Sequence, residues 1–410
     1  MKIINGNFDI SYDKPMTVSG HASDNEYRYE YDGSVEVNFI AFFTAKEDTF
    51  ILQIDTLYID DQLKLEIQDE LKRENVPIIV LCIASHSHSL PGIDLEKPRL
   101  GAYCKKYRDF LKRTIVKNIL INIDSFKSEK VSFSSFKKFS RLSIGRRGCK
   151  SKGNFSLLSL RNTVPDFSQL GANIEITCFW DKNRTRIVSI IWSFPAHPVL
   201  YPNKQKFSAD FPGRVREMLR EELKDESLTI LYFPGCAGDR RPLIKSQTKS
   251  KSFLDLVVGQ SFKECDYINY EEYCKSLKSD LIDCINSLRL KKIDYQLKTI
   301  DYQESKISLN KIGINNKTNN FLRIESLKLN EKVRFIFLNC EPSYAYHNFF
   351  AEDCTVTGYS SGVFGYLPTD IQVNQGGYEV NGFMPFFGTS GSFVKDIKKV
   401  LKSECTINQP

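Results

Sequence analysis

Short hydrophobic runs alternate with longer amphipathic stretches along the first part of the chain. Residues 50–55 and 78–84 are runs of apolar side chains bounded by polar residues, a pattern typical of buried strands. Between them, residues 60–75 place leucine and isoleucine at helical spacing among charged residues, which predicts an amphipathic helix. The first elements are therefore expected to follow one another as strand, helix and strand.

The same alternation continues toward the carboxyl end of the chain. Asp181-Lys-Asn lies between two apolar runs and predicts a hairpin turn. From the whole pattern we predict the α/β fold class, with a mixed β-sheet core and surrounding helices. The expected helices cover residues 103–123, 213–223 and 270–288, and the expected strands cover residues 174–180, 186–194, 228–233 and 334–339.

Three segments carry weaker patterns. Residues 124–170 are polar and rich in Ser, Lys and Phe, which predicts edge strands and loops, whereas residues 358–388 are rich in Gly, Tyr and Phe, which predicts an ordered loop system. The Lys- and Ser-rich stretch at 243–255 is expected to be a mobile surface loop. Because no internal repeat or long linker interrupts the chain, we expect one large domain over residues 1–410.

Composition supports a buried core, because 41% of the 410 residues are hydrophobic and 12% are aromatic. The net charge of +7 fits an acidic small substrate and does not favour a nucleic-acid partner. The 11 cysteines form no CxxC pair, the first residues lack a signal-peptide pattern, and the longest apolar run, at 78–84, is too short to span a bilayer. We therefore expect a cytoplasmic protein without a transmembrane segment, and leave its oligomeric state open.

Four of the apolar strands end in loops of small and polar residues, at 85–92, 195–198, 234–239 and 340–344. In open α/β sheets, ligands bind in the crevice beyond the carboxyl ends of the strands. The side chains that carry chemistry are therefore expected in these loops.

Three of the five histidines lie in the strand-end loops. His86 and His88 are two residues apart on an extended segment, which places both imidazoles on one side of the chain. Zinc binds neutral imidazole, so the pair is a candidate metal site, although a polar loop with two exposed histidines has the same pattern. His197, between Ala196 and Pro198, is either a rigid-loop residue or a further ligand.

The other loops supply candidate groups of different kinds. The glycines around Gly235 in Pro-Gly-Cys-Ala-Gly-Asp allow exposed backbone N–H groups that could face an oxyanion. Cys236 is a candidate thiol nucleophile, but a core cysteine is the better interpretation because nothing marks it as activated. Glu341 follows an apolar strand and could be a metal ligand or a general base. Tyr366 could be a ligand, although tyrosines usually pack.

The order of these motifs resembles the catalytic domain of the neutral/alkaline, non-lysosomal ceramidase family. His-x-His-Ser-x-Pro-Gly is followed by Ala-His-Pro, Gly-x-Ala-Gly-Asp, Glu-Pro and Gly-Tyr-x-x-Thr. Upstream, Phe8-Asp-Ile-Ser and Ser19-Gly-His-Ala are similar to the opening segment of the family, and Leu52-Gln-Ile-Asp55 is similar to its next strand. The resemblance covers most of residues 5–390 and implies a ceramidase-like catalytic fold.

The resemblance also implies a zinc ion as cofactor and gives roles to individual residues. The implied metal ligands are His86, His197, Glu341 and Tyr366. The other implied site residues are His88, beside the metal or facing the substrate; Arg146, near the reacting groups; and Tyr378, lining the substrate pocket.

Two departures from the family bear on the mechanism. Where characterised ceramidases carry the serine proposed as their nucleophile, this chain has Gly235 followed by Cys236, so a serine mechanism is not expected and both residues stay candidate catalytic positions. The chain also lacks the family's carboxyl-terminal immunoglobulin-like domain and its usual secretion signal. This favours a cytoplasmic relative over a ceramidase that acts at lipid surfaces.

The favoured hypothesis is a zinc-dependent amidohydrolase that cleaves an N-acyl bond with metal-activated water. Its substrate would be an N-acyl lipid, an N-acyl amino sugar or a related small amide. Asp210 and Asp239 are expected to hold loops or to orient a histidine. One alternative is a metal-dependent esterase or phosphoesterase, which the lack of an Asn-His-Asp/Glu motif disfavours. The other is a non-catalytic relative that only binds ligand, which the retained candidate ligands disfavour.

Overall fold

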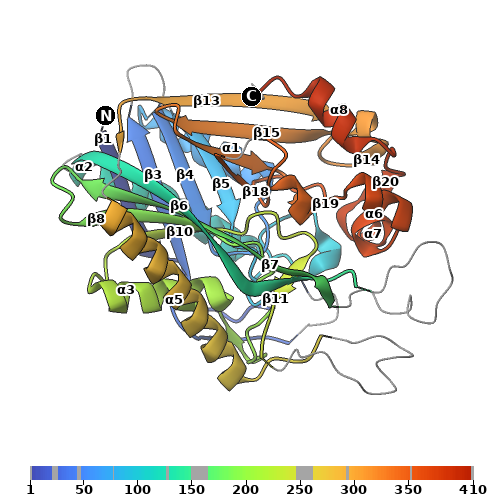
Figure 1. The fold of residues 1–410 in the computed structure, drawn as a ribbon, viewed down its shortest axis with the longest axis horizontal. Coiled ribbons are helices and arrows are strands. Elements are labelled where there is room, and N and C mark those ends of the chain that lie inside the picture. Colours follow the sequence, from blue (N-terminus) through green and yellow to red (C-terminus); the bar gives the residue numbers. More distant parts are fainter. Residues whose placement is uncertain are drawn as a thin grey trace.

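The structure, a computed structural model, describes residues 2–20, 26–43, 48–76, 78–125, 129–148, 165–245, 262–291, 295–350 and 353–407. Most of the expected mobile loop at 243–255 lies outside these residues. A large and a small β-sheet share a hydrophobic layer, and helices cover the other face of the large sheet (Figure 1). No helix in the described part of the chain combines the length and the apolar character needed to cross a membrane.

The large sheet has the main strand order β10-β8-β7-β6-β1-β3-β4-β5, and β11 and β12 pair with β6. β3 is antiparallel to β1 and β4, whereas β4–β5 and β8–β10 are parallel pairs, so the predicted mixed sheet is confirmed. Its strands are β1 (Lys2–Asp9), β3 (Glu36–Phe43), β4 (Asp48–Ile54), β5 (Ile78–Ala84), β6 (Glu129–Gly145), β7 (Asp166–Asp181), β8 (Ile187–Ser193), β10 (Thr229–Phe233), β11 (Arg240–Pro242) and β12 (Tyr295–Gln296).

Amphipathic helices cover the outer face of the large sheet. α1 and α2 pack on β1, β3, β4 and β5, while α3 and α5 pack on β7, β8 and β10. α1 starts where Asp60 accepts the backbone N–H of Leu63, and each fully buried leucine or isoleucine on its inner face contributes roughly 1.5–3 kcal/mol. These helices are α1 (Asp61–Arg73), α2 (Lys105–Ser125), α3 (Asp210–Leu223) and α5 (Tyr267–Lys291).

The small sheet has the strand order β13-β15-β16-β18 and packs on the inner face of the large sheet. Alternate residues of β16 point to opposite sides, so that Phe335 and Phe337 meet the large sheet while Ile336 faces the carboxyl-terminal segments. The Phe233 ring of β10 lies edge-on to both phenylalanines, at 5.9 and 5.6 Å between ring centroids. The strands are β13 (Ile300–Ser308), β15 (Phe321–Leu329), β16 (Val333–Leu338) and β18 (Cys354–Thr357).

Shorter elements complete the described chain. They are the strands β2 (Glu30–Tyr31), β9 (Lys206–Phe207), β14 (Ile314–Asn316), β17 (Glu341–Pro342), β19 (Tyr366–Leu367) and β20 (Thr389–Gly391), the helices α6 (Asp370–Gln375), α7 (Met384–Phe387) and α8 (Ile397–Glu404), 3-10 helical turns at Pro98–Leu100, Leu309–Ile312 and Tyr344–Tyr346, and a π-helical turn at Tyr378–Gly382.

Two sequence expectations need correction. The stretch at 124–170 holds β6, which lies between β7 and β1 inside the large sheet and not at its edge. The expectation fails because serine is small enough to be buried in a sheet: Ser132 and Ser134 are buried, and Ser134 accepts the Trp180 indole N–H at 2.8 Å. The stretch at 358–388 is not only loop, since it contains α6, the π-helical turn and α7.

A buried ionic cluster fastens α3 to the start of β3 and the end of β4 in the large sheet. Arg220 donates two hydrogen bonds to the Glu36 carboxylate, at 2.6 and 2.9 Å, and Arg216 lies 3.2 Å from the same carboxylate. Arg216 also donates to Asp55 at 2.8 Å. Burial opposes the ionisation of Glu36, but the two arginines outweigh it and lower the pKa of Glu36 to about 2.

We expect Glu36→Gln to lower the free energy of unfolding by roughly 3–5 kcal/mol at pH 7, because it leaves the buried Arg220 guanidinium without its counter-charge and removes one of the two carboxylates that face Arg216. Urea denaturation measures this loss. Since the folded pKa of Glu36 lies below its ordinary value of 4.5, its stabilisation is complete above about pH 5 and is lost as the pH falls from 4.5 toward 2. The variant should therefore lose this part of the acid sensitivity.

Glu30→Gln is the matched control. Glu30 pairs with Lys206 at 2.8 Å on the surface, where the pair is exposed to solvent, so its removal should leave the unfolding curve unchanged. Equal losses of stability in the two variants would contradict a special contribution from the buried cluster.

Candidate metal centre

Loops from both sheets meet at one point. His86 follows β5 and His197 follows β8 in the large sheet, whereas Glu341 begins β17, directly after β16 of the small sheet. β17 is parallel to β19, and Glu341 is the register partner of Tyr366. Three of the four implied ligands, His86, His197 and Glu341, therefore follow the ends of separate strands. The fourth, Tyr366, is brought beside Glu341 by the pairing of two short strands.

The backbone holds His86 in an unusual conformation. His86 has a φ of +64°, in the left-handed region that side chains other than glycine rarely adopt, and its N–H donates to the Thr56 carbonyl at 2.9 Å. Tyr359, whose ring centroid lies 4.3 Å from that of His86, has a φ of +63°. Strain of this kind persists only where the surroundings impose it, so the orientation of His86 is set by the fold.

The ligand atoms lie at distances that suit a metal ion. Glu341 Oε2 is 3.1 Å from His197 Nε2 and 3.7 Å from His86 Nε2. His88 Nε2 is 3.3 Å from His86 Nε2, and one ring nitrogen from each of the three histidines falls within 4.8 Å of the others. Two ligand atoms of a tetrahedral zinc ion are roughly 3.3 Å apart, since each zinc bond is about 2.1 Å long.

Both implied ligand histidines direct Nδ1 at backbone carbonyl oxygens. His86 Nδ1 lies 3.2 Å from the Leu57 oxygen, and His197 Nδ1 lies 2.8 Å from the Ala237 oxygen and 3.1 Å from the Arg240 oxygen. Because a carbonyl oxygen only accepts, each Nδ1 carries a proton. Burial lowers the pKa of His86 to about 3 and the pKa of His197 well below 6.5, so both rings are neutral at pH 7.

A neutral ring with its proton on Nδ1 presents a lone pair at Nε2. The Nε2 lone pairs of His86 and His197 therefore face the Glu341 carboxylate, which also only accepts. Acceptors that face one another at 3–4 Å in a buried site repel, and a cation between them removes the repulsion. The residues present thus fit a zinc ion, which commonly takes two histidines and a carboxylate.

Two tyrosines outside the predicted ligand set complete the surroundings of Glu341. Tyr58 donates a short hydrogen bond to Glu341 Oε1, and Tyr359 donates to Oε2 at 3.3 Å. Both hydroxyls are buried, and burial raises the pKa of each phenol well above 10. Tyr58 follows β4 at the end of a strand, so attention to the loop after residues 50–55 would have found it.

The structure brings Arg146, Tyr366 and Tyr378 to the same region. The Arg146 guanidinium lies 5.5 Å from the centroid of the Tyr366 ring, which is 5.5 Å from that of Tyr378. Arg146 donates to Glu379 at 3.0 Å, and Arg147 forms a second short contact with that carboxylate. Arg146 Nη2 is buried and has no hydrogen-bond partner among the described residues, while the guanidinium also interacts with the Tyr366 hydroxyl.

Gly235 and Cys236 make structural contacts instead of joining this group. The Gly235 N–H donates to the Thr357 hydroxyl at 3.2 Å, and the Cys236 thiol faces the Val356 carbonyl inside a hydrophobic cluster. Burial raises the pKa of the Cys236 thiol well above 9. Gly238 in the same turn lies so close to the Glu341 backbone that a Cβ would be 2.6 Å from the Glu341 carbonyl oxygen. The glycines of this motif therefore allow close packing of the loops.

The two aspartates hold loops, as expected. Asp239 accepts the Tyr344 backbone N–H and the Gln372 side-chain amide, both at 2.7 Å. Asp210 accepts the Leu200 backbone N–H at 2.8 Å, and burial raises its pKa to about 6. Neither aspartate orients a histidine by a hydrogen bond among the described residues, because backbone carbonyls take that role.

Comparisons with known proteins bear on the fold. No protein-family model matches the sequence, and no curated protein matches it. Among solved structures, the chain is similar to a neutral ceramidase from Pseudomonas aeruginosa, with a TM-score of 0.72 and 13% identity over 92% of this chain and 70% of that one. It is also similar to a ceramidase complexed with C2, with a TM-score of 0.70 and 13% identity over 92% and 71%. The ceramidase-like fold expected from the motifs is confirmed.

We expect the wild-type protein to retain close to one zinc ion per chain after dialysis against zinc-free buffer, and His86→Ala and Glu341→Gln to lose it. Each variant removes one of the converging ligand atoms. Elemental analysis of the purified proteins measures the zinc content, and circular dichroism checks that the variants fold.

His347→Ala is the control for the loss of a histidine. His347 stacks on Tyr344 at 4.2 Å between ring centroids and belongs to no metal-binding group among the described residues. It should retain the zinc of the wild type. The metal site would be wrong if His86→Ala held as much zinc as His347→Ala.

Proposed function

We propose that this protein is a zinc-dependent hydrolase that cleaves the amide bond of an N-acyl compound. The observation that carries the proposal is the buried Glu341 carboxylate facing the Nε2 lone pairs of His86 and His197, which calls for a cation. The fold adds support, because the similar solved structures are named as ceramidases. Amides with a lipid-like acyl chain are accordingly the first substrates to test.

His86, His197 and Glu341 would hold the zinc ion, with Tyr366 as the fourth protein ligand or as a contact to the substrate. When bound, zinc lowers the pKa of a water ligand toward 7 and polarises a carbonyl group. Tyr58 and Tyr359 fix the Glu341 carboxylate through hydrogen bonds, and the carbonyl oxygens of Leu57 and Ala237 fix the imidazoles.

His88 is placed to move protons. Its Nε2 lies 3.3 Å from His86 Nε2, and its side chain also lines a cavity of about 550 Å³ that opens beside the centre. A group between metal and cavity can hold a proton at Nε2 and deliver it to the departing amine. Gly20 packs against this ring so closely that a Cβ would lie 2.4 Å from His88 Nδ1, which restricts its rotation.

Arg146 is placed to stabilise negative charge on the carbonyl oxygen of the substrate. Glu379 fixes the guanidinium at 3.0 Å, and the buried Nη2 donor is left without a partner among the described residues. A prepositioned donor in a site that excludes water stabilises an oxyanion at little cost in reorganisation. This role takes the place of the backbone donors expected around Gly235.

We expect the zinc-loaded protein to hydrolyse fatty-acyl anilides and other N-acyl amides, and the chelator-treated protein to lose this activity until zinc is restored. A panel of acyl anilides, p-nitrophenyl esters and p-nitrophenyl phosphates identifies the bond that is cleaved. Activity on phosphates alone, or equal activity with and without zinc, would contradict the proposal.

We expect His88→Ala to lower kcat by roughly 10²–10⁴-fold while the zinc content stays that of the wild type, because His88 is assigned to proton transfer and not to metal binding. Steady-state kinetics and elemental analysis on one preparation separate the two roles. Loss of zinc together with activity would instead make His88 a ligand. His347→Ala should leave both quantities unchanged.

A further inference from the structure

The cavity beside His88 is rich in positive charge. Its volume is about 550 Å³, enough for a small organic molecule. The charged residues that line it are Arg28, Lys204, Arg241 and Lys263 on the positive side and Glu26 and Glu264 on the negative side. Because His88 lines the same cavity, a molecule bound there would reach the candidate metal centre.

Arg240 and Arg241 are neighbours on β11 and point to opposite sides of the strand. Arg240 is buried, and its guanidinium donates to Ser143 Oγ and to the carbonyls of Gln169 and Gly171. Arg241 instead lines the cavity, where its guanidinium lies 4.4 Å from the centroid of the Phe262 ring. A guanidinium with one face on an aromatic ring keeps its N–H edge free to donate.

No carboxylate in the described part of the chain forms an ion pair with Arg241. The nearby Glu379 is shared by Arg146 and Arg147. Burial, reinforced by the positive charge of Arg146, lowers the pKa of Arg241 to about 10. An anion bound beside Arg241 would relieve both the desolvation and the repulsion.

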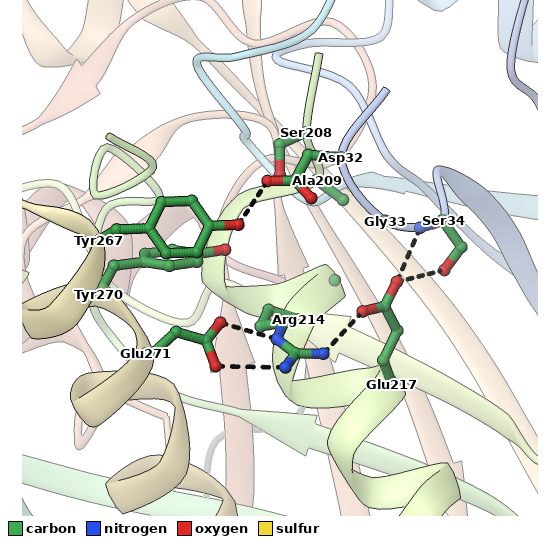
Figure 2. A pocket seen from close by; sticks show the side chains of 11 residues that line it. Asp32, Gly33, Ser34, Ser208, Ala209, Arg214, Glu217, Tyr267, Tyr270 and Glu271 are labelled. Atoms are coloured by element: carbon green, nitrogen blue, oxygen red, sulfur yellow. Dashed lines mark hydrogen bonds and ion pairs between the residues drawn. The ribbon is translucent and has the colours of Figure 1, made fainter. Parts of the chain in front are cut away.

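Arg214 also lines a cavity, but among the described residues it pairs with carboxylates of the protein, unlike Arg241. A second cavity, of about 450 Å³, is lined by Arg214, whose guanidinium faces Glu271 and Glu217 (Figure 2). The guanidinium donates to both oxygens of Glu271, at 2.8 and 3.2 Å, and to Glu217 at 3.2 Å. That arginine is neutralised by the protein itself. Among the residues that the structure describes, no carboxylate pairs with Arg241, so its charge is directed at the cavity.

We propose that the cavity beside His88 binds substrates that carry a carboxylate on the amine side of the scissile amide, and that Arg241 pairs with this carboxylate. The planar guanidinium fork matches a carboxylate through two parallel hydrogen bonds. The proposal rests on the proposed amide hydrolysis and specifies the class of substrate: an acidic N-acyl compound, such as an N-acyl amino acid.

Binding tests the carboxylate preference without turnover. Titration calorimetry on the zinc-free protein compares N-octanoylglycine with the neutral N-octanoylglycinamide. We expect the wild type to bind the acid roughly 10- to 100-fold more tightly, Arg241→Gln to bind both within twofold, and Arg241→Lys to keep part of the preference. Arg289→Gln, at an exposed position near the end of α5, removes the same charge and should keep the full preference.

Equal binding of the two ligands by the wild type, or a full preference in Arg241→Gln, would overturn the proposal. Arg241→Lys keeps the test decisive if Arg241→Gln does not fold.

Hydrolysis of both amides by the zinc-loaded wild type is measured separately. If neither is cleaved but the carboxylate preference in binding holds, the proposed function fails and the carboxylate site stands. If both are cleaved with equal kcat/KM and bound equally, the carboxylate site fails and amide hydrolysis stands.

Discussion

The arrangement of the centre depends on one buried carboxylate that faces two imidazole lone pairs. Glu341 Oε2 lies within 3.1–3.7 Å of the Nε2 atoms of His86 and His197, whose protons are held at Nδ1 by backbone carbonyls. The facing atoms of these three side chains are all acceptors. The two tyrosine hydroxyls donate to the Glu341 carboxylate and relieve part of its charge, and a cation would relieve the repulsion that remains between the carboxylate and the imidazole lone pairs.

The two sheets must meet for this cluster to exist. His86 and His197 lie at the ends of strands of the large sheet, and Glu341 follows β16 of the small sheet. Phenylalanines from both sheets pack in the shared layer, which fixes their separation. Beside the centre, the N–H of Gly238 donates to the Pro342 carbonyl at 2.9 Å, and the N–H of Gly358 donates to the Gly235 carbonyl at 3.1 Å. The glycine-rich motif thus joins the loops that carry the ligands.

Four arginines near the candidate metal centre differ in whether the protein itself supplies partners for their guanidinium groups. Glu379 compensates Arg146 and Arg147, and backbone carbonyls bind Arg240. Arg241 alone of these four faces the cavity without a carboxylate partner among the described residues. The position of the positive charges therefore matters more than the net charge of +7. A single uncompensated guanidinium in a partly desolvated cavity selects anions more strongly than many solvated lysines.

The sequence by itself determined the fold class, the main helices and strands, and the strand-end loops that hold His86, His197 and Glu341, because hydrophobic periodicity and motif order are properties of the chain. It misplaced β6, because the buried serines of this strand have the pattern of a polar surface strand, and it assigned no role to Tyr58 or Arg241. One domain over residues 1–410 stays a prediction. Only the tertiary structure decided which polar groups meet: the proton positions on the imidazoles, the contacts of Cys236, and the position of Arg241 on the cavity depend on neighbours remote in sequence.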